Sequence, residues 1–168
     1  MIKIKYILLI VCLAGCFAAC KKTENTNDGA SQAAQLTADT TAIRKFIVAN
    51  NIPAIKDKSG VFYQIIAPGT GSVVYTANTT ITANYAGRLL NGTVFDTNLS
   101  STGAVVTPFS FTLPNVIVGW QVGIPYIQNG GQIRLIIPSL YGYGSTAVGT
   151  IPANSILDFT ITLTNVQN

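Results

Sequence analysis

Residues 81–96 read ITANYAGRLLNGTVFD, a segment whose pattern predicts two paired strands. From Ile81 to Tyr85, apolar and polar side chains alternate, which is typical of a strand with one buried face. Asn91-Gly92 then separates Leu89-Leu90 from Thr93-Val94-Phe95. Asn-Gly accepts the positive φ angles of a type I′ turn, so the segment predicts a β-hairpin.

Three further segments, 61–66, 133–137 and 157–164, also predict strands. The last is the clearest, because apolar residues at its odd positions alternate with Asp158 and three threonines. Between the strands, only 118–127, with Gly119 and Pro125 near its ends, could form a short helix. We therefore expect an α+β fold in which a curved antiparallel β-sheet wraps on this short α-helix.

An N-terminal helix is predicted over 39–50. Asp39-Thr40-Thr41 resembles a helix cap, and Asn50-Asn51 with Pro53 would end the helix. Apolar residues between them recur at helical spacing: Ile43, Phe46 and Ile47. The helix would form a lead-in, 39–58, to a domain over 59–168. Residues 21–38 (KKTENTNDGASQAAQLTA) are polar and small, and are predicted to form a disordered tether.

The first twenty residues, 1–20, resemble a lipoprotein signal peptide. Lys3 and Lys5 precede an apolar run over 6–19 that ends in small residues before Cys20. This run is shorter than the about 20 residues of a membrane-spanning helix. An ordinary cleaved signal and a single anchor helix are the other interpretations.

Cys20 is the residue that we expect to be acylated, because polar sequence begins directly after Phe17-Ala18-Ala19-Cys20. Cys16 is the alternative, in Leu13-Ala14-Gly15-Cys16, which matches the consensus of such sites better. Two acyl chains hold a protein stably on a bilayer. The expected location is therefore the cell envelope of a Gram-negative bacterium, lipid-anchored and periplasmic or outer-membrane.

The composition excludes several chemistries. Charged residues make up only 10% of the chain, which is unfavourable for a nucleic-acid partner because such a partner requires clustered Lys and Arg. The formal net charge of +4 includes Lys3 and Lys5, which belong to the segment expected to be removed. The chain has no histidine, so no Ser-His-Asp or Cys-His pair and no histidine-containing zinc site is possible. All three cysteines lie in the first twenty residues. We therefore expect no metal, no cofactor and no covalent catalysis.

Seven short motifs follow one another from residue 84 onward. They are Asn84-Tyr85-Ala86-Gly87; Asn91-Gly92-Thr93-Val94-Phe95-Asp96; Pro108-Phe109-Ser110-Phe111; Val116-Ile117-Val118-Gly119-Trp120; Gly123-Ile124-Pro125 with Gly130-Gly131; Tyr141-Gly142-Tyr143-Gly144; and Ile151-Pro152-Ala153-Asn154 before Leu157-Asp158-Phe159. In this order and spacing, the chain over 59–168 resembles the FKBP-type peptidyl-prolyl cis-trans isomerases. The helix over 39–50 with Ser59-Gly60-Val61 resembles the lead-in of exported bacterial members.

The resemblance implies a proline pocket with Trp120 as its floor. Its lining would be Tyr85, Phe95, Asp96, Phe109, Val116, Ile117, Trp120, Tyr143, Ile151 and Phe159. Tyr85, Phe109 and Phe159 would be walls, and Asp96 would lie at the polar rim. Ligand hydrogen bonds would come from the Ile117 backbone N–H and the Tyr143 hydroxyl.

The implied activity is cis-trans isomerisation of X-Pro bonds during the folding of exported proteins. A pocket without histidine, cysteine or lysine suits this reaction, because rotation about an amide bond needs no acid or base. Unfolded or nascent proline-containing polypeptides would be the partners, with macrolides as candidate ligands. A non-catalytic FKBP scaffold that holds unfolded chains or a partner is the alternative function.

Other residues are expected to be structural or to modify the site. Phe111 is expected in the core, and Asp158 and Arg134 are expected to be structural. Pro114 stands where the family usually has glycine, so it is expected to alter the loop before Ile117. The segment 97–107 is long and has an apolar tip, Ala104-Val105-Val106, which is expected to cover or extend the pocket or to contact unfolded chains.

Overall fold

The computed structural model describes residues 26–168. Its elements in chain order are α1 (Thr26–Ala49), β1 (Ile55–Lys56), β2 (Phe62–Ala67), β3 (Thr80–Leu89), β4 (Val94–Thr97), β5 (Phe109–Thr112), the 3-10 helix η2 (Leu113–Asn115), α2 (Val118–Gly123), the 3-10 helix η3 (Ile124–Tyr126), β6 (Gln132–Ile137), the 3-10 helix η4 (Ser139–Tyr141) and β7 (Leu157–Gln167). The α+β class predicted from the sequence is confirmed.

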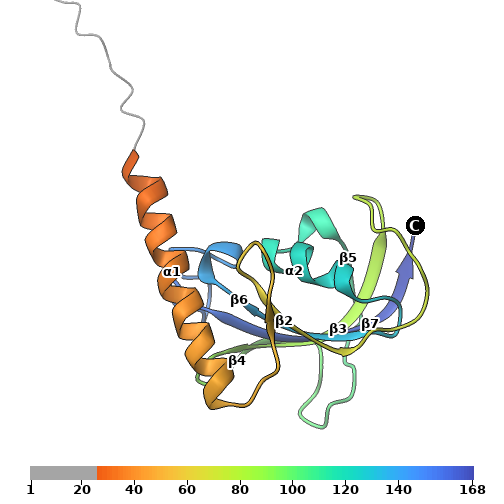
Figure 1. Cartoon of the computed structure of the whole chain (residues 1–168). Helices are drawn as coiled ribbons and strands as arrows, with labels where there is room; N and C mark the ends of the chain where they lie inside the picture. The colour runs from red at the N-terminus through yellow and green to blue at the C-terminus, as the bar shows by residue number, and fades with distance from the viewer. Residues whose placement is uncertain (1–25) are drawn as a thin grey trace, which may run out of the picture.

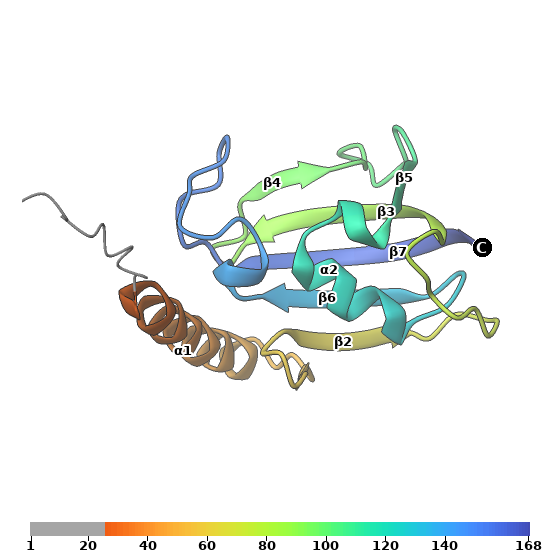
Figure 2. The same cartoon turned by 90° about the horizontal axis from the view of Figure 1, so that it is seen from above.

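Within this part of the chain the strands form one antiparallel sheet in the order β1-β2-β6-β7-β3-β4, and β5 pairs with β3. The longest pairing is between β3 and β7, from Thr80 opposite Gln167 to Leu89 opposite Leu157. The sheet curves, and α2 lies over one of its faces (Figures 1 and 2). We call the face under α2 the inner face and the opposite one the outer face.

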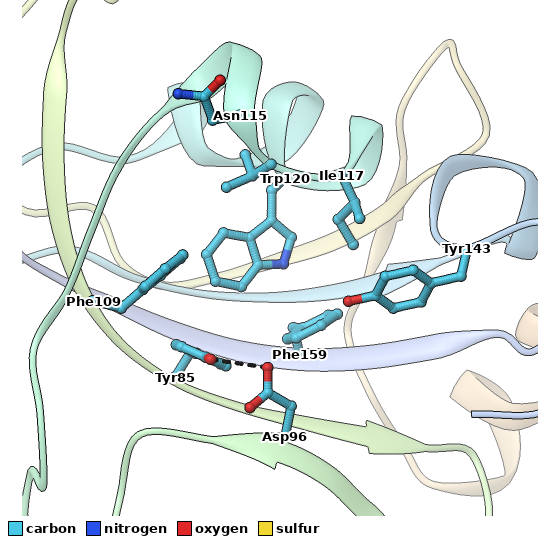
Figure 3. A pocket seen from close by; sticks show the side chains of 9 residues that line it. Tyr85, Asp96, Phe109, Asn115, Ile117, Trp120, Tyr143 and Phe159 are labelled. Atoms are coloured by element: carbon cyan, nitrogen blue, oxygen red, sulfur yellow. Dashed lines mark hydrogen bonds between the residues drawn. The ribbon is translucent and has the colours of Figure 1, made fainter. Parts of the chain in front are cut away.

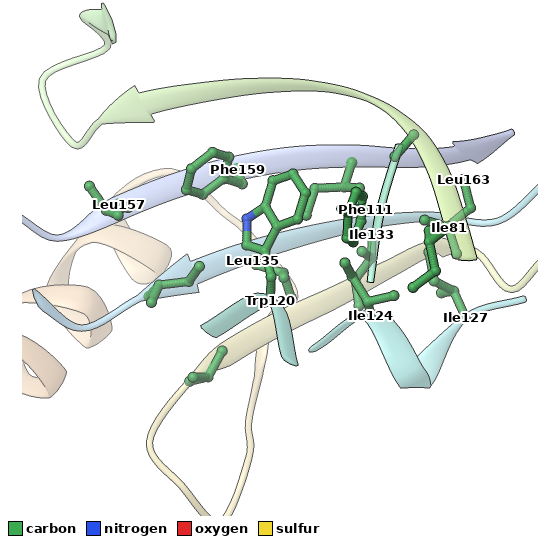
Figure 4. Packing of buried hydrophobic residues seen from close by; sticks show 14 of the residues in the cluster. Ile81, Phe111, Trp120, Ile124, Ile127, Ile133, Leu135, Leu157, Phe159 and Leu163 are labelled. Carbon is green, nitrogen blue, oxygen red and sulfur yellow. The ribbon is translucent and has the colours of Figure 1, made fainter. Parts of the chain in front are cut away.

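The main core lies between the inner face and α2 (Figure 4). The predicted alternation holds in both central strands, since the odd-numbered apolar residues of β6 and β7 are buried: Ile133, Leu135, Ile137, Leu157, Phe159, Ile161 and Leu163. Gly119 and Gly123 let α2 approach the sheet. A Cβ at either position would clash with Ile137 or Leu135.

The outer face has a polar centre and one covered end. On it Arg134 of β6 forms a bidentate ion pair with Asp158 of β7, with N···O distances of 2.9 and 2.6 Å, so both residues are structural as expected. At one end α1 packs on a second apolar cluster of Ile43, Ile52, Phe62 and Ile136. In β2 only the first half is packed. Ile65 and Ile66 are exposed because β1 pairs only with Phe62 and Tyr63.

The prediction of a disordered tether over 21–38 is wrong for residues 26–38, because α1 begins at Thr26 and continues to Ala49. Ala, Gln and Leu, which favour helices, dominate its sequence from Ala30 to Leu36. Asp39 is therefore no cap. It is buried within the helix and accepts hydrogen bonds from the Ser139 backbone N–H at 2.8 Å and hydroxyl at 2.6 Å. This pair fixes α1 to the domain.

The predicted hairpin is confirmed, but its turn is not type I′. Leu89 and Thr93 are paired, and Gly92 N–H donates to Leu89 C=O. Within the turn only Gly92 has a positive φ, of 89°. Asn91 accepts a hydrogen bond from Thr93 N–H through its side chain instead. The connection is thus one residue longer than a two-residue turn, and the glycine alone takes the left-handed conformation.

The predicted signal peptide, the acylation sites Cys16 and Cys20 and residues 21–25 of the tether lie outside the described residues. Across residues 26–168, none of the helices has the length and apolar character that a membrane crossing requires.

A buried carboxylate joins the first strands to η3. Asp57, in the turn between β1 and β2, accepts a 2.6 Å hydrogen bond from the Tyr126 hydroxyl, and the ring of Tyr126 stacks on Tyr63 at 4.4 Å. The bond from Tyr126 lowers the pKa of Asp57 from 3.8 to about 2, with smaller contributions from Ser59 against the opposing effect of burial.

We predict that Tyr126→Phe lowers the free energy of unfolding at pH 7, and that this loss shrinks as the pH falls. A carboxyl whose pKa is lowered on folding stabilises the fold fully above its unfolded pKa, and the contribution disappears as the pH falls from about 4 through about 2. Urea unfolding at pH 7, 4, 3 and 2 measures the difference. Tyr75→Phe is the matched control, because the Tyr75 hydroxyl donates to the uncharged Ile127 carbonyl. A Tyr126→Phe loss as constant with pH as that of the control would contradict the prediction.

Candidate functional site

A cavity of about 250 Å³ opens on the inner face beside α2. Its lining consists of Tyr85, Asp96, Phe109, Asn115, Val116, Ile117, Trp120, Tyr143 and Phe159 (Figure 3). Ligand sites for drug-sized molecules usually enclose roughly 300–1,000 Å³. This cavity therefore suits one small ring or side chain, and the rest of a longer ligand would lie at its rim.

Trp120 forms the base of the cavity. It projects from α2 toward the sheet, and only 4% of its surface is exposed. Its ring meets the rings of Tyr85, Phe111 and Phe159 edge to face, with centroid distances of 5.4, 5.4 and 5.2 Å. Edge-to-face pairs are favourable because the positive edge of one ring meets the negative face of the other. Phe111 is 7% exposed and lies in the core, as expected.

The Trp120 indole nitrogen is buried and has no hydrogen-bond partner among the described residues. Buried polar groups without a partner are uncommon and often occur at functional sites.

Tyr85 and Asp96 form the polar side of the cavity. The Tyr85 hydroxyl donates to Asp96 Oδ2 at 2.9 Å. Burial, first, and then the hydrogen bond and negative charge of Asp96 raise the pKa of Tyr85 well above 10. Burial and, to a lesser degree, the Asp96 charge also raise the pKa of Tyr143. Both phenols are therefore neutral donors at physiological pH.

The strand that holds Tyr85 is fixed by Asn98, a residue that the sequence did not single out. Its side chain accepts from Tyr85 N–H at 2.7 Å and donates to the carbonyls of Ala83 and Thr107, each at 3.0 Å. Asn98 thus joins the start of the 97–107 segment to its end and to β3. In the sequence, an asparagine after a strand indicates only a turn. These long-range hydrogen bonds of Asn98 become visible only in the folded structure.

Val116 and Ile117 reach the cavity from the connection between η2 and α2. Pro114 lies in the first turn of η2, where its missing N–H is tolerated. The Gln121 side chain donates to Val116 C=O at 2.8 Å and fixes the backbone. Ile117 is the residue before α2, and its N–H makes no backbone hydrogen bond within residues 26–168. This amide is available to a ligand.

Two of the ten predicted lining residues do not line the cavity. Phe95 packs behind Phe159, edge to face at 5.4 Å, and Ile151 is 6% exposed within the core. Both support the wall rather than form it. Conversely, Asn115 lines the cavity and was missed, because its place depends on the η2 turn, where its amide donates to Thr112 Oγ1.

The apolar tip at 104–106 does not cover the cavity, contrary to one expectation. Leu99 and Val105 pair with each other and line a hollow on the outer face with Ala86, Arg88 and Thr160. The segment between β4 and β5 projects from the side of the sheet opposite α2 (Figure 1). Val106 is 69% exposed there. Tyr85 is the one residue that lines both this hollow and the cavity.

Among the described residues no three acidic, cysteine or histidine side chains gather in a group that could hold a metal ion. The cavity presents apolar ring faces, two phenols, the Asn115 carboxamide, one backbone amide and one carboxylate.

Residues 72–164 match the family model of the FKBP-type peptidyl-prolyl cis-trans isomerases. With this cavity and fold, the chain belongs to that family. Its relatives include the FKBP-type peptidyl-prolyl cis-trans isomerase FkpA of Buchnera aphidicola subsp. Schizaphis graminum, 45% identical over 113 residues, which cover 67% of this chain and 43% of the relative. FkpA of Escherichia coli K12 is 38% identical over 109 residues, or 65% of this chain and 38% of the relative.

The chain thus spans less than half the length of these curated relatives. Solved structures agree with the fold. The crystal structure of FkpA from Escherichia coli aligns with a TM-score of 0.66 and 33% identity over 84% of this chain and 63% of that one. A peptidyl-prolyl cis-trans isomerase from Pseudomonas syringae aligns with a TM-score of 0.62 and 31% identity, over 79% of this chain and 96% of its own.

We predict that Asp96→Asn lowers the pKa of Tyr85 and, by less, that of Tyr143. The substitution removes the negative charge that opposes ionisation of both phenols, whereas burial continues to hold both pKa values above 10. NMR titration of ¹³Cζ-labelled tyrosines measures the shifts. Tyr75 is the internal control, because burial alone raises its pKa. An unchanged Tyr85 titration, or an equal shift of Tyr75, would contradict the arrangement described here.

Proposed function

We propose that this chain is a peptidyl-prolyl cis-trans isomerase that acts on unfolded or nascent proline-containing polypeptides. The observation that supports this best is the cavity itself, in which an indole floor lies beneath aromatic walls and beside an unpaired backbone amide. In this proposal the proline ring rests on Trp120 between Tyr85, Phe109 and Phe159. Val116 and Ile117 close one side.

The reaction must overcome the partial double-bond character of the X-Pro amide, a barrier of roughly 18–20 kcal/mol. The planar amide is more polar than the twisted one, so an apolar cavity disfavours the planar ground state relative to the transition state. Each ~1.36 kcal/mol of this difference accelerates rotation tenfold. No proton transfer is needed, which agrees with two phenols that stay neutral.

Two donors would hold the substrate while the amide turns. The Tyr143 hydroxyl points into the cavity, opposite Asp96 and Tyr85 (Figure 3). It and the Ile117 N–H would bind carbonyl oxygens that flank the proline, so that one side of the bond is fixed and the other rotates. Asp96, through its hydrogen bond, would hold Tyr85 in the wall. Phe95 and Ile151 would act indirectly, by supporting Phe159 and the core.

The size of the cavity also bears on macrolide ligands. We propose that a macrolide would enter with only one ring, because about 250 Å³ is too small for more. Most of such a ligand would then lie against exposed residues at the rim, among them Phe109, which is 39% exposed.

We predict that Trp120→Leu reduces the acceleration of a proline-limited refolding reaction by at least about tenfold, equivalent to about 1.4 kcal/mol of transition-state stabilisation. Uncatalysed isomerisation takes tens to hundreds of seconds, so the native chain's effect is easily measured. The matched control is Phe62→Leu, which removes a buried aromatic ring from the second apolar cluster, away from the cavity.

Circular dichroism first establishes that both variants are folded. Retained activity in folded Trp120→Leu, or an equal loss in Phe62→Leu, would exclude this cavity as the site. No acceleration by the native chain would exclude the activity.

We further propose that the chain is exported and lipid-anchored through Cys20, in the envelope of a Gram-negative bacterium. The basic residues Lys3 and Lys5, the apolar run over 6–19 and the polar residues after Cys20 support this. Its relatives from Buchnera, Escherichia and Haemophilus belong to Gram-negative bacteria. Anchoring would place the cavity near newly exported chains.

We predict that cells expressing the full chain incorporate labelled palmitate into it, and that Cys20→Ser abolishes the label. Cys16→Ser is the matched control and should keep the label, because the acylated cysteine is the one that remains after cleavage. Label lost only in Cys16→Ser would move the anchor to Cys16, and an unlabelled native chain would exclude the anchor.

A further inference from the structure

The cavity of the proposed active site has a single charged residue in its lining, Asp96. Between Asp96 and Arg134, and again between Arg134 and Asp158, the sequence contains no Lys, Arg, Asp or Glu. These stretches provide most of the cavity lining, through β5, η2, α2 and the segment that follows η4.

No cation of the described residues neutralises Asp96. The one ion pair in residues 26–168 joins Arg134 to Asp158 on the outer face. Arg88 lines the outer-face hollow, and Arg44 lies over the Phe62 ring at 5.8 Å. The other three cations are Lys45 on α1, Lys56 in β1 and Lys58 in the turn that follows β1. Asp96 therefore has no counter-ion among the described residues.

The carboxylate also retains a free acceptor. Asp96 is exposed, and its only hydrogen bond from the described side chains comes from Tyr85 to Oδ2, so Oδ1 accepts none from them. The effect of this charge extends across the cavity, since it contributes to the raised pKa values of both Tyr85 and Tyr143. A cavity of about 250 Å³ accepts the proline ring alone. The residues beside the proline must then lie at the rim, within reach of this charge.

We propose that Asp96 is a specificity-determining residue that makes the site prefer substrates with Lys or Arg beside the proline and disfavour those with Asp or Glu. This inference rests on the isomerase activity proposed above. A rim charge in contact with water changes encounter and affinity modestly and in a salt-dependent way. We expect kcat/KM for a Lys-Pro peptide to exceed that for the matched Glu-Pro peptide by about fivefold at low ionic strength. The preference should shrink toward one as salt is added.

The test uses the full chain in detergent and three peptides, Ala-Xaa-Pro-Phe with Xaa as Leu, Lys or Glu, with isomerisation rates measured by NMR exchange spectroscopy. The neutral Leu peptide reports the isomerase activity. The ratio of Lys to Glu rates reports the proposed selectivity, and within one variant it cancels any general loss of activity. In Asp96→Asn this ratio should fall to about one.

Asp57→Asn is the matched control, because it removes the same charge near β1, at the opposite edge of the sheet from β4. Its Lys to Glu ratio should equal that of the native chain. The selectivity proposal is overturned if the native chain shows a Lys to Glu ratio near one, or if Asp96→Asn leaves this ratio unchanged. In either case, activity on the Leu peptide would still support the proposed isomerase function. Failure to accelerate any of the three peptides overturns both.

Discussion

The packing of Trp120 against the inner face of the sheet is the contact on which core and cavity both depend. Gly119 and Gly123 bring α2 close enough for the indole to meet Tyr85, Phe111 and Phe159 edge to face. One surface of the ring thereby completes the core, and another is left as the base of the cavity. The site needs no moving part, because the rigidity of the core is also the rigidity of the floor.

That arrangement explains how a chain so poor in charge can have a defined candidate site. Catalysis by acids, bases or nucleophiles requires titratable groups near neutral pH, and the cavity has none beyond a carboxylate and two phenols with raised pKa values. Rotation about an amide requires instead a fixed apolar surface and a few donors. Both are supplied by packing and by backbone geometry, which uncharged residues provide as well as charged ones.

The sequence predicted the strands well and the positions of single polar residues poorly, for one physical reason. Burial on one face repeats every second residue, so β6 and β7 could be recognised locally. Most of the lining followed from the order of short motifs. Asp39 resembled a helix cap, yet its partner Ser139 lies 100 residues away. Asn98 and Asn115 likewise act through contacts that the local sequence pattern does not encode. Phe95 packs against Phe159 and does not line the cavity, although its neighbour Asp96 does.

A family resemblance likewise predicts the packed positions of this chain better than its exposed polar ones. Ring positions around Trp120 are constrained by packing, so they transfer between members that share the fold. The charge around the rim is not constrained in this way, because exposed loop residues can change at little cost in stability. In this chain the segments 97–133 and 135–157 contain no charged residue. Among the described residues that line the cavity, Asp96 is charged and none is a cation, so the electrostatic environment at the rim is that of one carboxylate.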